Sequence, residues 1–375
     1  MNSSFYINKP HKIIVNSITN SILEQNDAYS YHTSLHNYKP TPLIHLPNLS
    51  QKYHVGNIYI KDESFRFGLN AFKVLGASYA VNCILKEIPK AETFCTATDG
   101  NHGRAVAWSA KKFGKKAIVF VPKTTTEERI KAIQKEGATV IKVDGNYDYT
   151  CETVKNESSK NNWVLIQDTA WKNYVEIPSL IMAGYLTLFK EMENSLHTSA
   201  KPKIDILIIQ AGVGSLAGAA IYYYLKKYKK NSPEIVVVEP KEADGVLRSF
   251  KRNKISTSNG NSCTIMAGLN CETPSYSAWD LLKSGVNVSI RIDDIYAKQA
   301  IRELYYPIGS DPKIIAGESG AAGFAGFISV MQNKSYELVR KELNINENTN
   351  ILFINTEGDT DKNSFNRIIN KKNGD

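Results

Sequence analysis

The sequence predicts an α/β protein built on two mostly parallel β-sheets that are covered by helices. From residue 91 onward, short apolar runs alternate with amphipathic stretches of about ten or more residues, a pattern typical of strands followed by covering helices. The first four expected strands span residues 93–97, 117–121, 139–143 and 163–166. A second series is expected at residues 204–209, 235–239, 288–292 and 350–354. Two separate series favour two sheets over one.

Composition and charge favour an ordinary globular protein. With 375 residues, of which 42% are hydrophobic and 22% charged, the chain can bury a large core and form two domains. Its formal net charge of +9 raises the alternative of a nucleic-acid-binding protein. Lysines alternate with acids, however, as at Lys86 and Glu87 and at Lys135 and Glu136. This alternation favours a solvated basic surface over a nucleic-acid site.

No targeting segment or metal site is readable in the sequence. The first thirty residues contain no long apolar stretch after a basic start, and no apolar run is long enough to span a bilayer, so we expect a cytoplasmic protein. The five cysteines form no Cys-x-x-Cys pair and lack the spacing of metal ligands, so we expect reduced thiols and no bound metal. Cys263 and Cys271 are close enough in sequence that one disulfide stays possible.

Lys73 lies among apolar residues near an expected helix start, within the segment Phe-Gly-Leu-Asn-Ala-Phe-Lys-Val-Leu-Gly of residues 67–76. Asn70 is the expected N-cap, which places Lys73 in the first helical turn. Desolvation and the positive end of the helix both favour the neutral amine, the form of lysine that attacks a carbonyl to form a Schiff base. Taken alone, a lysine in such a setting is more often a solvated or snorkelling side chain.

A glycine-rich loop follows one of the expected strands and opens a helix of small residues. Residues 210–218 read Gln-Ala-Gly-Val-Gly-Ser-Leu-Ala-Gly. Glycines allow backbone N–H groups to point at a phosphate, the helix N-terminus adds partial positive charge, and Ser215 can donate a hydroxyl hydrogen bond. The same glycines could instead serve only the tight packing of a strand on a helix. A dinucleotide site would also need an acidic residue at the end of the next strand, and Glu239 loosely meets that need.

Polar residues follow three more expected strands, at the sheet edge where ligands bind in open α/β folds. Asn101 and His102 follow the first strand, Asp168 follows the fourth and Thr356 follows the last. Each segment by itself could be a plain turn or a helix cap. A candidate Schiff-base lysine, a phosphate loop and several polar strand ends together indicate a carbonyl cofactor that carries a phosphate, such as pyridoxal 5′-phosphate.

These segments together resemble the fold-type II pyridoxal-phosphate enzymes, the group that includes tryptophan synthase β and the serine and threonine dehydratases. Within that group the chain resembles the diaminopropionate ammonia-lyases, from about residue 38 to residue 361. The matching segments are residues 70–73, 98–104, 167–171, 210–214, 266–269, 317–321 and 356–361.

The resemblance implies a set of cofactor contacts. Lys73 would hold the cofactor aldehyde as an imine, Asn101 would approach the ring hydroxyl, and Thr356 would face the pyridine nitrogen. The phosphate would be bound by the glycine-rich loop, through Gly212, Val213, Gly214, Ser215 and Leu216.

The resemblance also implies a two-domain α/β fold and a homodimer. A large cofactor-binding domain would comprise residues 1–91 and 187–375, and a smaller inserted α/β domain would comprise residues 92–186. Asp99 and Asp168 would then belong to the smaller domain, with the cofactor in the cleft between the two. Closure of the smaller domain on substrate would bring these acids into place and exclude water.

The implied activity is that of a carbon–nitrogen lyase. Members of this family eliminate both amino groups of 2,3-diaminopropionate, as D and L isomers, to give pyruvate and two ammonia. Removing the Cα proton from either isomer requires a base on each face of the cofactor plane. Lys73 would serve the L isomer and Asp99 the D isomer, with Asp168 assisting at the β-ammonium. The related dehydratases commonly have Ser at the position of Asp99, so a serine or threonine dehydratase is the alternative that should not need this acid.

Overall fold

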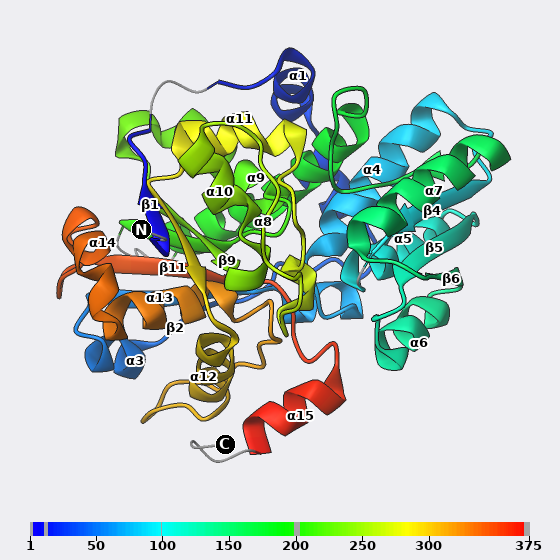
Figure 1. The fold of residues 1–375 in the computed structure, drawn as a ribbon. Helices are drawn as coiled ribbons and strands as arrows, with labels where there is room; N and C mark the ends of the chain where they lie inside the picture. The colour runs from blue at the N-terminus through cyan, green and yellow to red at the C-terminus, as the bar shows by residue number, and fades with distance from the viewer. Residues whose placement is uncertain (1–2, 11–13, 99, 199–202, 371–375) are drawn as a thin grey trace.

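The computed structural model describes residues 3–10, 14–98, 100–198 and 203–370, and it confirms the α/β class with two sheets. One sheet has seven strands in the order β1-β10-β9-β8-β11-β3-β2, and the other has four in the order β6-β5-β4-β7. Figure 1 shows β4, β5 and β6 with helices α5, α6 and α7 on one side of the molecule, apart from the larger sheet.

The seven-stranded sheet is parallel in its centre and antiparallel at its two edges. Its strands are β1 (Phe5–Ile7), β2 (Leu43–His45), β3 (Asn57–Asp62), β8 (Ile206–Gln210), β9 (Glu234–Pro240), β10 (Val288–Ile292) and β11 (Asn350–Asn355). The four later strands were expected from the sequence. The first three were not, because β1 and β2 are only three residues long and β3 ends in charged residues that a strand pattern would place outside a core.

The smaller sheet is entirely parallel. Its strands are β4 (Thr93–Ala97), β5 (Lys116–Pro122), β6 (Thr139–Val143) and β7 (Val164–Leu165). All four were expected, although β7 is two residues shorter than predicted. Both faces of this sheet are covered, because Phe94 of β4 belongs to the core on the side of α5 whereas Cys95 belongs to the core on the side of α7.

Helices cover both faces of the larger sheet as well. In the early part of the chain the helices are α1 (Ser17–Gln25), α2 (Ala28–Ser34), α3 (Pro47–Lys52), the 3₁₀ segment η1 (Glu63–Gly68), α4 (Lys73–Glu87), α5 (Asn101–Lys112), α6 (Glu127–Lys135), α7 (Tyr147–Asn161) and α8 (Glu176–Thr198). The later helices are α9 (Ser215–Tyr228), α10 (Gly245–Arg252), α11 (Tyr276–Gly285), α12 (Asp294–Tyr305), α13 (Ala322–Gln332), α14 (Glu337–Glu342) and α15 (Lys362–Asn370).

One hydrophobic core joins the two sheets through α4 and α8. Leu207 and Ile209 of β8 share this core with residues of α4, α5, α8 and α9, while Ile206 and Ile208 face the opposite core beneath α12 and α13. Helix α8 is continuous across residues 186 and 187, where the sequence suggested a limit between two domains. The two sheets are therefore connected by shared helices and not by an extended linker.

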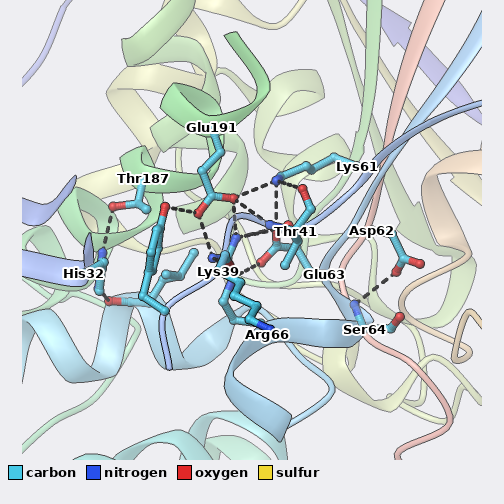
Figure 2. A network of polar contacts seen from close by, with 12 residues as sticks. His32, Lys39, Thr41, Lys61, Asp62, Glu63, Ser64, Arg66, Thr187 and Glu191 are labelled. Carbon is cyan, nitrogen blue, oxygen red and sulfur yellow. Dashed lines mark hydrogen bonds and ion pairs between the residues drawn. The ribbon is translucent and has the colours of Figure 1, made fainter. Parts of the chain in front are cut away.

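A buried ionic network ties β3, η1 and α8 together (Figure 2). Lys61 Nζ lies 2.7 Å from Glu191 Oε2, and Arg66 reaches the same carboxylate at 2.7 Å and Glu63 at 2.8 Å. Thr41 adds a hydroxyl hydrogen bond to Glu63 at 2.5 Å. The four charged side chains are no more than 1% exposed, so each depends on its partners to offset the cost of leaving water.

Replacing Glu191 with Ala is expected to lower the free energy of unfolding by about 3–5 kcal/mol, because Lys61 and Arg66 would stay buried without this carboxylate. Glu337, which forms an exposed pair with Lys341, is the matched control, and Glu337→Ala should leave the stability almost unchanged because water screens an exposed pair. Urea denaturation followed by circular dichroism measures both. Equal losses in the two variants would contradict the proposed importance of the network.

The same network predicts a direction of pH dependence. Burial alone would raise the pKa of Glu191, but Arg66 and Lys61 outweigh it and hold that pKa at about 2. A carboxyl whose pKa is depressed on folding stabilises the fold above its unfolded-state pKa, and this contribution is lost as the pH falls toward the folded-state value. The difference in stability between wild type and Glu191→Ala should therefore shrink as the pH falls from about 4.5 toward about 2.

Candidate active site

A single pocket brings together the segments that the sequence predicted to carry chemistry. It lies at the carboxyl ends of β4, β8 and β11 and at the first turns of α4, α5 and α9, the edge at which parallel α/β sheets bind ligands. The predicted site residues in its lining are Lys73, Asn101, Asp168, Gly212, Val213, Gly214, Ser215, Leu216 and Thr356.

Lys73 is the first residue of α4, and its side chain points to Asp168. The two atoms Lys73 Nζ and Asp168 Oδ2 lie 2.5 Å apart. The expected N-cap is wrong: Phe72 occupies that position, while Asn70 adopts a left-handed φ of +56° and its carbonyl accepts a hydrogen bond from Gly358 N–H. The turn before Lys73 is therefore held by the segment after β11 and not by a side-chain cap.

The ion pair reverses the expected protonation of the lysine. Burial alone would lower the pKa of Lys73, but the Asp168 carboxylate outweighs it and raises that pKa above its usual value. Burial alone would likewise raise the pKa of Asp168, and Lys73 together with His102 and hydrogen bonds lowers it to about 2. In this arrangement the amine is an ammonium, so the prediction of a neutral Lys73 from desolvation and helix position is wrong.

The glycine-rich loop forms a compact cradle between β8 and α9. Gly214 has a φ of +91°, which favours glycine, and a Cβ there would lie 2.9 Å from Leu282 Cδ1. A Cβ at Gly212 would lie 3.2 Å from both Cys271 Sγ and the Gly268 carbonyl oxygen. The Ser215 hydroxyl donates to the carbonyl oxygen of Asp168 at 3.0 Å, so the backbone N–H groups at the start of α9 are the donors that can face an anion.

Asn101 and His102 begin helix α5 and face the pocket from the smaller sheet. The Asn101 amide donates to the Glu357 carboxylate, which also accepts from Ser319 N–H at 3.1 Å. His102 Nε2 lies 2.8 Å from the carbonyl oxygen of Ile166, while Nδ1 lies 3.9 Å from Asp168. Burial lowers the pKa of His102, and the nearby Lys73 charge lowers it further, while the Asp168 carboxylate acts in the opposite direction.

Thr356 is held in place by Gln210 at the end of β8. The Gln210 amide nitrogen lies 2.9 Å from Thr356 Oγ1 and 2.8 Å from the carbonyl oxygen of Ser319. The Thr356 carbonyl oxygen accepts from Phe72 N–H at 3.1 Å, next to Lys73. The end of β11 is therefore bonded both to the glycine-rich loop and to the start of α4.

Asp99 lies outside the described residues, so its predicted role as a second base stays a prediction. Its neighbours Thr98 and Gly100 both line the pocket.

Several lining residues were not among the predicted site residues: His102, Arg129, Tyr147, Gln210, Cys271, Ser319 and Glu357. Gln210 and Glu357 lie at strand ends in segments that the sequence had singled out, so their position could have flagged them. Tyr147 lies on α7, which follows β6, and Arg129 lies on α6, which follows β5. No local sequence signal marks either residue. Tyr147 donates to Asp168 Oδ1 at 3.4 Å, which adds a third element to the environment of this acid.

Glu239 does not form part of a dinucleotide site. Its carboxylate accepts hydrogen bonds from Val246 N–H at 2.7 Å and from Leu247 N–H at 2.8 Å, at the start of α10. Burial raises the pKa of this group well above its usual value. Glu239 thus serves the N-terminus of a helix, which is a structural role.

The structure also bears on the cysteines, on metal binding and on membrane spans. Cys263 and Cys271 are not joined to each other, so the disulfide that the sequence left possible is not formed in this structure. Within residues 3–10, 14–98, 100–198 and 203–370, no group of three or more His, Cys, Asp or Glu could hold a metal ion. Over the same described part of the chain, no helix combines the length and apolar character needed to cross a membrane.

A family model for pyridoxal-phosphate dependent enzymes matches residues 35–356 of this chain. The chain belongs to this family. The diaminopropionate ammonia-lyases of Escherichia coli K12 and Salmonella typhimurium LT2 are 37% and 39% identical to it, over 91% and 92% of this chain and 90% and 91% of theirs. An L-threonine dehydratase of Staphylococcus epidermidis is 27% identical over 88% of this chain and 72% of its own.

Solved structures of the E. coli diaminopropionate ammonia-lyase have the same fold. Its complex with an aminoacrylate–pyridoxal phosphate azomethine intermediate matches with a TM-score of 0.90 and 35% identity, covering 97% of this chain and 96% of that one. Its apo form matches with a TM-score of 0.83 and 32% identity, covering 97% and 95%. The fold-type II assignment is therefore confirmed.

The pocket fits the cofactor of this family, pyridoxal 5′-phosphate. A lysine amine, a glycine cradle at a helix N-terminus, and amide and hydroxyl groups at the strand ends supply partners for an aldehyde, a phosphate and a polar aromatic ring. The cradle is tight, because Cβ atoms at Gly212 and Gly214 would meet neighbouring atoms at 3.2 and 2.9 Å.

Gly214→Ala is expected to weaken pyridoxal phosphate binding by about tenfold, because a Cβ at this left-handed position strains the loop by about 1–2 kcal/mol and contacts Leu282. Titration of the apoprotein with the cofactor, followed by visible absorbance, measures the affinity. Gly137 has nearly the same φ, +92°, outside the pocket, so Gly137→Ala is a control for strain alone. Equal losses of affinity in both variants would contradict the role of the cradle.

Proposed function

We propose that this chain catalyses the α,β-elimination of ammonia from D- and L-2,3-diaminopropionate, and that one water then hydrolyses the resulting aminoacrylate to pyruvate and a second ammonia. The observation that carries the proposal is the pair of Lys73 and Asp168 in the pocket, with Nζ and Oδ2 2.5 Å apart. This substrate needs a base for its Cα proton and an acidic side chain for its β-ammonium. Relatives that are 37–39% identical over most of the chain carry the name of this activity.

The cofactor contacts follow from the lining of the pocket. Lys73 Nζ would bind the aldehyde carbon, the backbone N–H groups of the loop from Gly212 to Leu216 would bind the phosphate, and Asn101 and Thr356 would contact the ring. When bound, pyridoxal phosphate stabilises the negative charge that develops at Cα after its proton is lost.

Asp168, Lys73 and Asp99 have separate roles in the proposed reaction. Asp168, whose pKa is held at about 2 in the presence of Lys73, is an anion at neutral pH and can bind the β-ammonium of the substrate. Its second oxygen accepts from Tyr147 at 3.4 Å, which limits its rotation. Lys73, as the free amine, would take the Cα proton of the L isomer, and Asp99 would take that of the D isomer from the other face.

The proposed enzyme is a cytoplasmic homodimer with two domains. Residues 92–186 would form the smaller domain and residues 1–91 and 187–375 the larger one. The four-stranded sheet of residues 93–165 supports this division, because its strands pair only with one another. Asn101 and Asp168 would approach the cofactor from the smaller domain, and its movement would control access of water.

Pyruvate release from separate D and L isomers of diaminopropionate, compared with L-serine and L-threonine, tests the proposed activity. We expect both diaminopropionate isomers to be the better substrates by at least about tenfold in kcat/KM. The dehydratase alternative, which the relative at 27% identity keeps open, predicts the reverse order. A visible spectrum before and after addition of the substrate reports whether the cofactor takes part.

Asp99→Asn is expected to lower kcat/KM for the D isomer by about a hundredfold or more, because an amide cannot accept the Cα proton. The L isomer should lose less than about threefold, since Lys73 would serve that face. A coupled assay of pyruvate formation measures kcat/KM for each isomer separately. Undiminished turnover of the D isomer would rule out Asp99 as the second base.

A further inference from the structure

Tyr185 of α8 has a buried hydroxyl whose presence needs an explanation. The residue is 0% exposed, and no group within the described part of the chain meets its hydroxyl at full hydrogen-bond geometry. An unpaired hydroxyl in a protein interior costs stability, so native proteins rarely keep one without a use. Phenylalanine would fill the same space without that cost.

Close packing of α8 on α4 places the Tyr185 ring next to the residues that carry Lys73. A Cβ at Gly76 would lie 2.6 Å from Tyr185 Cε1, and a Cβ at Gly184 would lie 2.4 Å from the carbonyl oxygen of Leu75. The ring of Phe72 lies 4.8 Å from that of Tyr185, measured between centroids. Glycines on both helices therefore allow an approach that presses the tyrosine against the first turns of α4.

The hydroxyl interacts with the lysine amine from this position. Its charged neighbours are Lys73 and Asp168. Burial raises the pKa of Tyr185 above its usual value, so the hydroxyl keeps its proton at neutral pH and acts as a hydrogen-bonding dipole rather than as a charge. A lysine ammonium has three N–H donors, and Asp168 Oδ2 takes one of them at 2.5 Å.

We propose that Tyr185 is a positioning residue for Lys73: its hydroxyl oxygen accepts a hydrogen bond from the Lys73 ammonium and holds Nζ in place when the lysine is not bound to the cofactor. Asp168, in the segment after β7, and Tyr185, in helix α8, would then each accept a hydrogen bond from a different N–H of the amine. The part of the proposal that concerns turnover rests on the proposed function.

His102 and Cys271 also lie near Lys73. His102 Nε2 is committed to the carbonyl oxygen of Ile166, while its Nδ1 lies 3.9 Å from Asp168 Oδ2 and has no hydrogen-bond partner among the described residues. His102 stays in place in a Tyr185 variant, so comparison with wild type isolates the contribution of the hydroxyl. Cys271 contributes electrostatically to the amine but is a weaker acceptor than a hydroxyl. Asp168 is the only one of these groups that carries a charge and bonds Lys73 directly, and it remains in place in a Tyr185 variant.

Capture of pyridoxal phosphate by the apoprotein gives a readout that needs no substrate. Only the neutral amine attacks the aldehyde, and the Tyr185 hydroxyl stabilises the ammonium, so Tyr185→Phe should lower the pKa of Lys73 and increase the fraction of neutral amine. Capture at pH 8, followed by visible absorbance, should then become about three- to tenfold faster. A variant that is merely damaged would instead capture the cofactor more slowly.

Tyr222 of α9 supplies the matched control. It is 5% exposed, and its hydroxyl is also buried and has no hydrogen-bond partner among the described residues, but the charge that it interacts with is Glu24 and not Lys73. Tyr222→Phe should leave the capture rate unchanged. Equal rates in Tyr185→Phe and wild type would overturn the proposal, and so would equal acceleration in both variants.

Turnover by the holoenzyme is a second measurement, in which Tyr185→Phe is expected to be slower than wild type and not faster. Tyr185→Phe should lower kcat for the L isomer by about three- to tenfold with little change in KM, because Lys73 is held less well after it leaves the cofactor. The D isomer should be affected less. If wild type forms no pyruvate from either isomer, the proposed function fails, while the capture rate still decides the contact of Tyr185 with Lys73. Should Tyr185→Phe not fold, Tyr185→Met tests the same loss of the hydroxyl.

Discussion

The ion pair of Lys73 and Asp168 is the interaction on which the functional part of this structure depends. It joins the first residue of α4, a helix that packs on α5 and α8, to the segment that follows β7, an edge strand of the smaller sheet. Burial opposes both charges, and their proximity, with smaller contributions from neighbouring groups, keeps them ionised. The pocket is therefore an electrostatic site whose two halves come from different parts of the chain.

The surrounding structure holds this pair from several directions. Ser215 donates to the backbone of Asp168, which ties the acid to the start of α9. The Gly358 and Phe72 backbone bonds fix the turn ahead of Lys73 to the segment after β11. Each of these contacts involves at least one backbone group, so the geometry of the site follows from how the strand ends meet and not from side-chain rotamers alone.

Helix α8 connects the site to the core of the protein. Tyr185 of α8 packs against Phe72 at the start of α4. About two turns later in the same helix, Glu191 forms ion pairs with Arg66 and Lys61. Arg66 lies in η1, a few residues before Lys73, within a segment where Phe67 has a left-handed φ of +48°. The buried charges therefore restrain a backbone conformation that non-glycine residues seldom adopt.

Local patterns in the sequence were enough to determine the α/β class, the strands after residue 91 and the segments that line the pocket, because apolar periodicity and glycine content are local properties. Strand β3 was missed because it ends in charged residues, and the ion-pair partner that allows Lys61 to be buried is Glu191, far away in sequence. The ammonium form of Lys73 could not be predicted for the same reason: its pKa is set by Asp168, 95 residues later in the chain. Only the tertiary structure brings these charges together, and inside a protein it is the nearest opposite charge that decides which form of a buried group is stable.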